Sequence, residues 1–294
     1  MKNRLFTIAS ATSLLALVSA CTPEAPTMSY QARVLECVRE NGFTMLAAHR
    51  AGFGPGYAEN AIASIQRNAE LGVLYAEVDV AESSDGQLYL MHDWTLDRTT
   101  TGTGEIRETA WSYISTLNLV DPDGQELDET VPTFEDTILA AREAGVYLNL
   151  DLKNVSEQTL VEAIAANNAE NEVIVIAYTV EDAALLHALN PDLVLSAPNR
   201  PQELADAGVN LDNVYLWLGV GEPDAEQDAA LATQGLEAAA GLFPLENGET
   251  ALYTNAAATG VEVLSIDDVL TGSRALGGRT ALDPQIETCR TAAR

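Results

Sequence analysis

Acidic and basic side chains recur at the ends of apolar segments, where they could act together. Glu77 and Asp79 lie two residues apart in "LYAEVDV", and Asp151 and Lys153 share this spacing in "YLNLDLK", so each pair points to one face of a strand. Charge clustered in an interior is costly unless it is compensated. We predict that Glu77, Asp79 and Asp151 bind one divalent cation, Ca²⁺ or Mg²⁺, both of which prefer oxygen ligands. The alternative is a structural salt-bridge network with Arg50 and Lys153.

Two of the three histidines stand at similar positions. His49 ends an apolar run and is followed by Arg50 and by the glycine-rich "GFGPG", while His92 ends "YLMH". Histidine exchanges a proton near neutral pH, so this pair suits general base and general acid catalysis. The third, His187, lies within the helical pattern "AALLHALN", and we expect it to be structural.

Strand-like and helix-like segments alternate along most of the chain, which is typical of a parallel sheet covered by helices. The eight segments expected to form parallel strands are 43–49, 74–80, 147–153, 172–178, 193–197, 214–218, 241–245 and 261–266. Eight strands in this arrangement predict a TIM barrel, in which function collects at the carboxyl ends of the strands.

One further strand, 88–92, follows residue 80 too closely for a parallel crossover, so it must return as a hairpin through Asp85 and Gly86. Residues 94–132 are rich in Thr, Gly and Asp, and we expect a loop excursion over the barrel mouth. The predicted fold is therefore a (β/α)8 barrel with an extra β-hairpin and an excursion after the second strand. No internal repeat and no second core are expected.

The first residues resemble an export signal. Residues 1–20 combine a basic start with an apolar stretch too short to span a bilayer, and they end just before Cys21, as in a bacterial lipoprotein. We predict a signal peptide, lipidation of Cys21, a tether over 21–34 and one barrel domain over 35–294. The protein would be anchored to a membrane and face the periplasm or cell surface. Thr22 favours the outer membrane.

The formal net charge of −29 would repel phosphate backbones and excludes nucleic acid as an expected partner. An anionic substrate would need a metal or a few placed cations. Besides Cys21 the chain contains Cys37 and Cys289. In an oxidising compartment a closed barrel would bring their segments together, which predicts a disulfide; alternatively, they are two buried residues that never meet.

The combination of "AHRAGFGPGYAEN", "AEVDVAESSDGQLYLMHDWTLDRTTTGTG" and "LNLDLK" resembles the glycerophosphodiester phosphodiesterase family. The similarity covers residues 43–154 closely, and "GVEVLSIDD" resembles the last strand of that family. It implies that His49 and His92 are the catalytic pair, that Glu77 and Asp79 bind metal, and that Arg50 contacts phosphate.

Other positions follow from the same resemblance. Asp151 occupies a position where the family usually has glutamate, and Lys153 follows two residues later as a second phosphate contact. Glu59 matches the acidic residue that closes the first loop. The family favours glycine directly after His-Arg, where this chain has Ala51.

The resemblance implies metal-dependent hydrolysis of glycerophosphodiesters to glycerol 3-phosphate and an alcohol, with a neighbouring substrate hydroxyl attacking phosphorus. One alternative is a phospholipase-type activity on lysophospholipids or sphingolipids, and another is a non-catalytic phosphodiester-binding lipoprotein. Arg98 either clamps phosphate or pairs with Asp93 or Asp97. Trp217 and Phe243 either border the leaving-group pocket or pack in the core.

Overall fold

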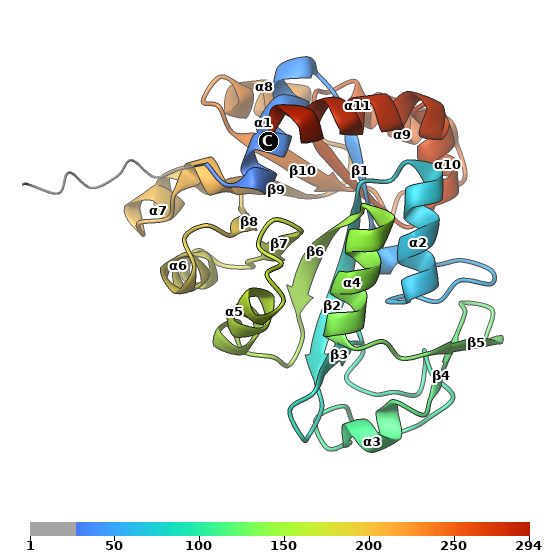
Figure 1. The fold of residues 1–294 in the computed structure, drawn as a ribbon. Helices are drawn as coiled ribbons and strands as arrows, with labels where there is room; N and C mark the ends of the chain where they lie inside the picture. The colour runs from blue at the N-terminus through green and yellow to red at the C-terminus, as the bar shows by residue number, and fades with distance from the viewer. Residues whose placement is uncertain (1–27) are drawn as a thin grey trace, which may run out of the picture.

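The computed structural model describes residues 28–294, and eight parallel strands close into a barrel (Figure 1). The barrel strands are β1 (Met45–Ala48), β2 (Tyr75–Glu82), β6 (Tyr147–Leu152), β7 (Val173–Ile176), β8 (Val194–Pro198), β9 (Val214–Val220), β10 (Glu237–Gly241) and β11 (Val263–Ile266). Strand β1 pairs with both β2 and β11, which closes the sheet. The predicted fold class is confirmed.

Helices follow the strands and cover the outside of the barrel (Figure 1). They are α2 (Ile62–Leu71), α4 (Phe134–Ala144), α5 (Glu157–Ala166), α6 (Val180–Leu189), α7 (Pro201–Asp206), α8 (Ala225–Ala232), α9 (Thr250–Ala257), α10 (Val269–Ala275) and α11 (Gly278–Ala292). Several begin at a side-chain cap of the kind that satisfies free backbone N–H groups, such as Ser156 before α5 and Thr179 before α6. Within residues 28–294 no helix is long and apolar enough to cross a membrane.

The predicted start of the domain at residue 35 falls inside a helix. Helix α1 (Tyr30–Asn41) begins after Ser29, whose side chain accepts a hydrogen bond from the Ala32 backbone N–H. Val34 and Leu35 are buried against the barrel, so packing starts before the predicted boundary. The polar residues taken for a tether include the helix cap. The predicted signal peptide and Cys21 lie outside the described residues.

The seventh strand was predicted at the wrong place. The sequence predicts it at 241–245, but α8 ends at Ala232 and β10 spans Glu237–Gly241. Alanine has the highest helix propensity of all residues, so "EAAAG" favoured a helix. Tertiary packing overrides that preference here, because small side chains in β10 leave room inside the barrel.

The hairpin prediction is confirmed, since β3 (Leu88–Leu90) pairs antiparallel with β2. The excursion over 94–132 contains three short elements, α3 (Trp111–Ile114), β4 (Asn118–Val120) and β5 (Glu126–Thr130). They lie beside the hairpin, at the lower right of Figure 1. Contrary to expectation, a second hydrophobic cluster forms here, with Tyr89, Leu96 and Ile114 fully buried. Its apolar residues are too scattered along a polar segment to show a period.

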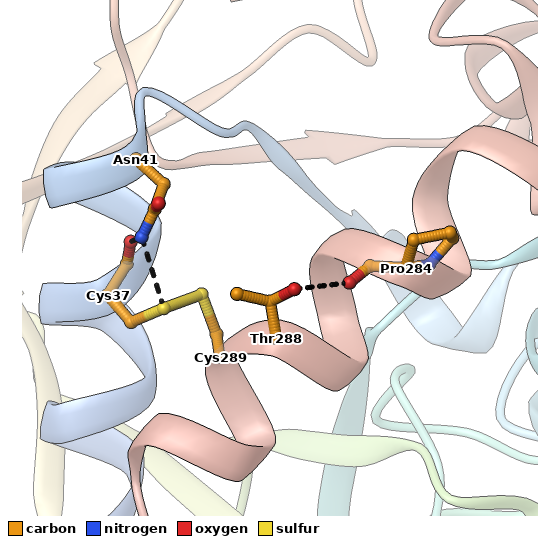
Figure 2. Close-up of a disulfide and its surroundings, with 5 residues drawn as sticks. All are labelled: Cys37, Asn41, Pro284, Thr288 and Cys289. Atoms are coloured by element: carbon orange, nitrogen blue, oxygen red, sulfur yellow. Dashed lines mark hydrogen bonds between the residues drawn. A yellow bond between two sulfur atoms is a disulfide. The ribbon is translucent and has the colours of Figure 1, made fainter.

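Helices α1 and α11 are joined by a disulfide between Cys37 and Cys289, whose Cα atoms are 5.3 Å apart (Figure 2). The Tyr147 hydroxyl, at the start of β6, hydrogen-bonds to Tyr30 of α1 and accepts from Arg290 of α11. The first and last described helices therefore pack together at the end of the barrel where the strands begin, opposite the mouth.

Loss of this disulfide should lower stability without changing the mouth. We expect Cys37→Ser/Cys289→Ser to lower the free energy of unfolding by about 2–5 kcal/mol, because a link across 252 residues restricts the unfolded chain. Urea unfolding of the oxidised, reduced and doubly substituted protein measures the change. Equal midpoints for all three would contradict it.

A buried carboxyl lies near the same end of the barrel. Glu262 precedes β11, and its Oε2 accepts a hydrogen bond of 2.7 Å from the Ala238 backbone N–H. Burial raises the pKa of Glu262 to about 8, and the negative charges of Asp228 and Glu237 contribute further. The folded protein therefore holds this proton more tightly than the unfolded chain, whose carboxyl has the ordinary pKa of 4.5.

This difference predicts a pH-dependent stability. The contribution of the Glu262 carboxyl is complete below about pH 4.5 and is lost as the pH rises through 8. Glu262→Gln keeps an acceptor and removes the titration. We therefore expect the variant to gain stability relative to the parent protein, by on the order of a few kcal/mol, between pH 5 and pH 8.5. Denaturant unfolding at both pH values tests this, and a constant difference would refute it.

Candidate active site

Three carboxylates from two neighbouring strands meet at the barrel mouth. Glu77 and Asp79 lie on β2 and Asp151 lies on β6, where the Asp79 and Asp151 Cα positions are paired in register. Each side chain is at least nine-tenths buried, and one oxygen from each lies within 4.8 Å of the others. The period of two along the strands places all three on the interior face.

Lys153 neutralises part of this charge. Its Nζ lies 2.9 Å from Asp79 Oδ1 and 2.7 Å from Asp151 Oδ2. Burial alone would lower the pKa of Lys153, but the two carboxylates raise it above its ordinary value. Tyr178 also donates a 2.8 Å hydrogen bond to Asp151 Oδ2. The predicted salt-bridge alternative is thus present for Lys153, but one lysine cannot balance three carboxylates.

The remaining charge makes the three carboxylates a fitting site for a metal ion. Burial, followed by repulsion from Asp79, raises the pKa of Glu77 well above its ordinary value. Asp151 Oδ1 is buried, and no protein group in the described part of the chain hydrogen-bonds to it. Three hard oxygen donors, one of them without a partner, match the chemistry that Ca²⁺ and Mg²⁺ require.

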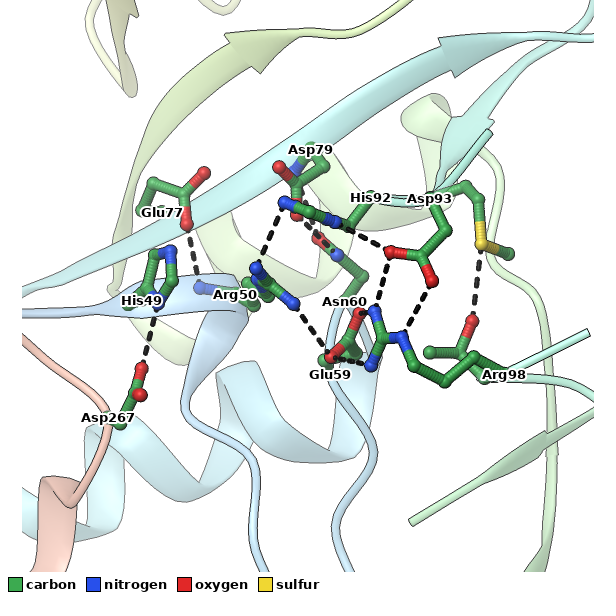
Figure 3. A network of polar contacts seen from close by, with 12 residues as sticks. His49, Arg50, Glu59, Asn60, Glu77, Asp79, His92, Asp93, Arg98 and Asp267 are labelled. Carbon is green, nitrogen blue, oxygen red and sulfur yellow. Dashed lines mark hydrogen bonds and ion pairs between the residues drawn. The ribbon is translucent and has the colours of Figure 1, made fainter. Parts of the chain in front are cut away.

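His92 is held in a single tautomer from two sides (Figure 3). Its Nδ1 lies 2.8 Å from Asp93 Oδ1, and its Nε2 lies 2.9 Å from Arg50 Nη2. A guanidinium can only donate, so Nε2 must be the acceptor and Nδ1 carries the proton. The Nε2 lone pair of His92 therefore points at the Arg50 guanidinium.

Arg98, from the excursion, supports this arrangement. It donates to both oxygens of Asp93, at 2.6 and 2.8 Å, and to both oxygens of Glu59, at 2.8 and 2.7 Å. Its hydrogen bonds lower the pKa of Asp93, and those carboxylates in turn raise the pKa of Arg98. Of the two sequence-based alternatives, the structure shows pairing with Asp93. Glu59, Asp93 and His92 also form a compact acidic group, but the guanidinium supplies its cation.

His49 is oriented by Asp267, which the sequence analysis did not assign, and by Phe243. Its Nδ1 lies 2.7 Å from Asp267 Oδ1 (Figure 3). Its ring also stacks on Phe243, with centroids 4.4 Å apart. Asp267 follows β11, and its backbone N–H donates to Glu246. Its position after a barrel strand, in "SIDD", was the available signal. His49 and His92 thus each have a carboxylate at Nδ1.

The backbone turn at Arg50 is strained, and it sends the backbone N–H and the side chain of this residue towards different partners. Arg50 and Ala51 have φ angles of 50° and 65°, in the left-handed region that costs non-glycine residues about 1–2 kcal/mol. The left-handed conformation at residue 51 explains why glycine suits that position in the family. This turn points the Arg50 backbone N–H at Glu77 Oε2, at 2.7 Å, while its side chain reaches Glu59 and His92.

A cavity of about 500 Å³ opens beside these groups. Its polar surface includes Asn149, Ser196 and Tyr215, whereas Trp217 and Phe243 belong to its apolar surface. Both aromatic rings line this cavity, and Trp217 also packs against the core. Tyr178 lines the cavity as well and is largely exposed at its rim.

Comparison with known proteins identifies the family. Residues 49–265 match the model of the "Glycerophosphoryl diester phosphodiesterase family", and this range extends from His49 to the end of the barrel. The chain belongs to this family. Its catalytic histidines, metal ligands and phosphate contacts remain predictions by position, but the geometry brings all the predicted residues to one rim.

Curated relatives match parts of the chain. A Caldanaerobacter subterraneus glycerophosphodiester phosphodiesterase is 31% identical over 142 residues, which cover 46% of this chain and 58% of that protein. Human glycerophosphodiester phosphodiesterase 1 is 27% identical over 187 residues, which cover 60% of this chain and 55% of the human protein. An uncharacterized Bacillus subtilis protein, YqiK, is 30% identical over 157 residues, covering 51% and 64%. The chain thus spans less than two thirds of the length of these relatives.

Solved structures share the fold. A glycerophosphoryl diester phosphodiesterase from Parabacteroides distasonis superimposes with a TM-score of 0.73 at 24% identity, over 79% of this chain and 86% of that one. An Oleispira antarctica phosphodiesterase was solved in complex with the product sn-glycerol-3-phosphate. It superimposes with a TM-score of 0.66 at 23% identity, over 81% of this chain and 98% of that one.

Gly241 provides the space that Phe243 and Trp217 occupy. A Cβ at this position would lie 2.7 Å from Phe243 Cε1 and 2.9 Å from Trp217 Cη2. We expect Gly241→Ala to displace the Phe243 ring from His49 and to cost about 1–3 kcal/mol of stability through overpacking. Imidazole NMR signals test this, because His49 should shift while His187, on α6, should not. An unshifted His49 signal would contradict the expectation.

Proposed function

We propose that this protein hydrolyses glycerophosphodiesters to glycerol 3-phosphate and an alcohol. The observation that carries the proposal is that His49 and His92, each with a carboxylate at Nδ1, converge with Arg50 on the three buried carboxylates. Family membership supports the same reaction. A non-catalytic binding protein would not require two oriented proton carriers.

A divalent cation, Ca²⁺ or Mg²⁺, would be held by Glu77, Asp79 and Asp151. When bound, it would polarise a phosphoryl oxygen and offset negative charge in the transition state. Lys153 and Arg50 would contribute further positive charge next to the phosphate. Arg50 Nε is buried and has no acceptor within residues 28–294, so a phosphate oxygen would satisfy it.

The two histidines would move protons in two balanced steps. In the first, the substrate hydroxyl next to the ester attacks phosphorus, its proton passes to one histidine, and the departing alcohol receives a proton from the other. A cyclic phosphate results. In the second, water opens the ring and the proton transfers run in reverse. We assign the base of the first step to His92, because the hydrogen bond from Arg50 keeps its Nε2 unprotonated.

The apolar part of the cavity favours a second candidate substrate class. Trp217, Phe243 and the exposed Val220 offer a surface for an alkyl chain. A phospholipase-type activity on lysophospholipids or sphingolipids would use the same catalytic groups. Comparing glycerophosphocholine with lysophosphatidylcholine as substrates separates the two candidates.

We further propose that the protein is exported and anchored through a lipid on Cys21, with the barrel facing the periplasm or cell surface. The disulfide between Cys37 and Cys289 supports an oxidising compartment. Mass spectrometry of the membrane-extracted protein would test this by detecting, or failing to detect, an acylated Cys21 at the new N-terminus.

The activity itself is tested by release of glycerol 3-phosphate from glycerophosphocholine and glycerophosphoethanolamine. We expect EDTA to abolish turnover and added Ca²⁺ or Mg²⁺ to restore it. His49→Ala should lower kcat about 10²–10⁴-fold, because a proton carrier is lost. His187→Ala is the matched control and should retain activity, since His187 lies on α6, away from the mouth. Undiminished turnover in EDTA, or a kcat of His49→Ala equal to that of the parent protein, would contradict the proposed function.

A further inference from the structure

Asn149 lies beneath the proposed metal site, and none of the catalytic steps above uses it. It precedes Asp151 by two residues on β6, so both side chains point into the barrel, and its Cα is paired in register with that of Glu77. The Asn149 side chain is only 4% exposed and lines the cavity.

Within residues 28–294 the Asn149 side chain makes one hydrogen bond, through its amide nitrogen. Its Nδ2 donates to the Tyr215 hydroxyl at 3.1 Å. Burial raises the pKa of Tyr215 to about 12, so this hydroxyl stays neutral. Asn149 Oδ1 is buried, and no group within residues 28–294 donates to it. An unpaired buried acceptor is unfavourable, and a donor group of a ligand would remove that cost.

The chemistry of the cavity restricts what that donor can be. An amide oxygen only accepts, so its partner is either a cation or an O–H or N–H group of the ligand, and we consider the second case. The carboxylates of Glu77 and Asp151 are further acceptors nearby. A neutral hydroxyl suits these surroundings, because its O–H bond can rotate towards any of these acceptors. Positions two apart on a strand are about 6.6 Å apart, which is comparable with the reach of a three-carbon chain from the phosphate.

We propose that Asn149 Oδ1 accepts a hydrogen bond from the terminal hydroxyl of the substrate glycerol, the hydroxyl that does not attack phosphorus. This inference rests on the proposed function and names its specificity: the deep, polar part of the cavity selects a free polyol. The leaving alcohol then lies towards Trp217 and the rim. A chain esterified to the terminal hydroxyl removes the donor, so lysophospholipids acylated there become poor substrates.

The first test pairs two substrates with two proteins. The substrates are glycerophosphocholine and its analogue with hydrogen in place of the terminal hydroxyl, and the proteins are the parent and Asn149→Leu, which has similar volume. We expect the parent to prefer glycerophosphocholine by about tenfold or more in kcat/KM, and Asn149→Leu to lose that preference while its kcat/KM for the analogue changes less than about twofold. Asn118→Leu, on β4, is the control and should keep the parental preference.

Several results would overturn the inference. Equal kcat/KM for the two substrates in the parent protein would do so, as would Asn149→Leu lowering both values equally. Calorimetric titration with Ca²⁺ or Mg²⁺ adds a readout independent of activity, and loss of ion binding in Asn149→Leu would make Asn149 a metal ligand instead. If neither substrate is turned over by the parent, the proposed function fails, and this inference fails with it.

A second measurement needs no variant and decides the matter if Asn149→Leu does not fold. It compares inhibition of the parent protein by glycerol 3-phosphate and by 1,2-propanediol 1-phosphate, which lacks only the terminal hydroxyl. We expect the latter to inhibit about tenfold more weakly. Equal inhibition constants would overturn the role of Asn149, even though hydrolysis of glycerophosphocholine would still stand.

Discussion

The burial of three carboxylates within reach of one another is the constraint on which the rest of the mouth depends. Glu77, Asp79 and Asp151 face one lysine, and the interior offers little water to screen their repulsion. Such an arrangement is stable only with further positive charge or with a raised pKa, as at Glu77. The same excess of negative charge makes the site able to take a cation and then an anionic phosphate.

The surrounding residues keep that charge in place without neutralising it. Asn60 binds Asp79 through both its side-chain groups, by donating to Oδ2 and accepting from the Asp79 backbone N–H. Asn60 has a φ of 56°, and asparagine tolerates this region better than most residues. Arg98 joins Glu59 to Asp93 and so fixes His92. The left-handed backbone conformations of Arg50 and Asn60 thus lie where the site requires side chains with fixed orientations.

Much of this arrangement could be predicted from the sequence, because strand periodicity is a strong constraint. Residues two apart on a strand must share a face, and the carboxyl ends of parallel strands must meet at one rim, which brings Glu77, Asp79 and Asp151 together. The disulfide joins the first and last helices near the start of the strands, as a closed barrel allows. These inferences need no knowledge of side-chain contacts.

Other features could not be predicted because they depend on tertiary contacts. Strand β10 is rich in alanine and resembles a helix until the barrel interior is considered. Asp267 contacts His49 although it follows the last strand of the barrel and lies 218 residues away in the sequence. Arg98 could have paired with either Asp93 or Asp97. The unpaired oxygen of Asn149 becomes visible only when every buried neighbour is known.

The most direct test of this account is calorimetric titration of the metal-free folded protein with Ca²⁺ and with Mg²⁺. The account predicts one ion bound per chain and an affinity at least about tenfold lower in Asp79→Asn, which removes a carboxylate but keeps the shape of the side chain. Glu262→Gln, which alters a buried carboxyl near the opposite end of the barrel, should bind as the parent does. Absence of binding, or equal affinity in Asp79→Asn, would mean that the three carboxylates are balanced by Lys153 and protonation alone.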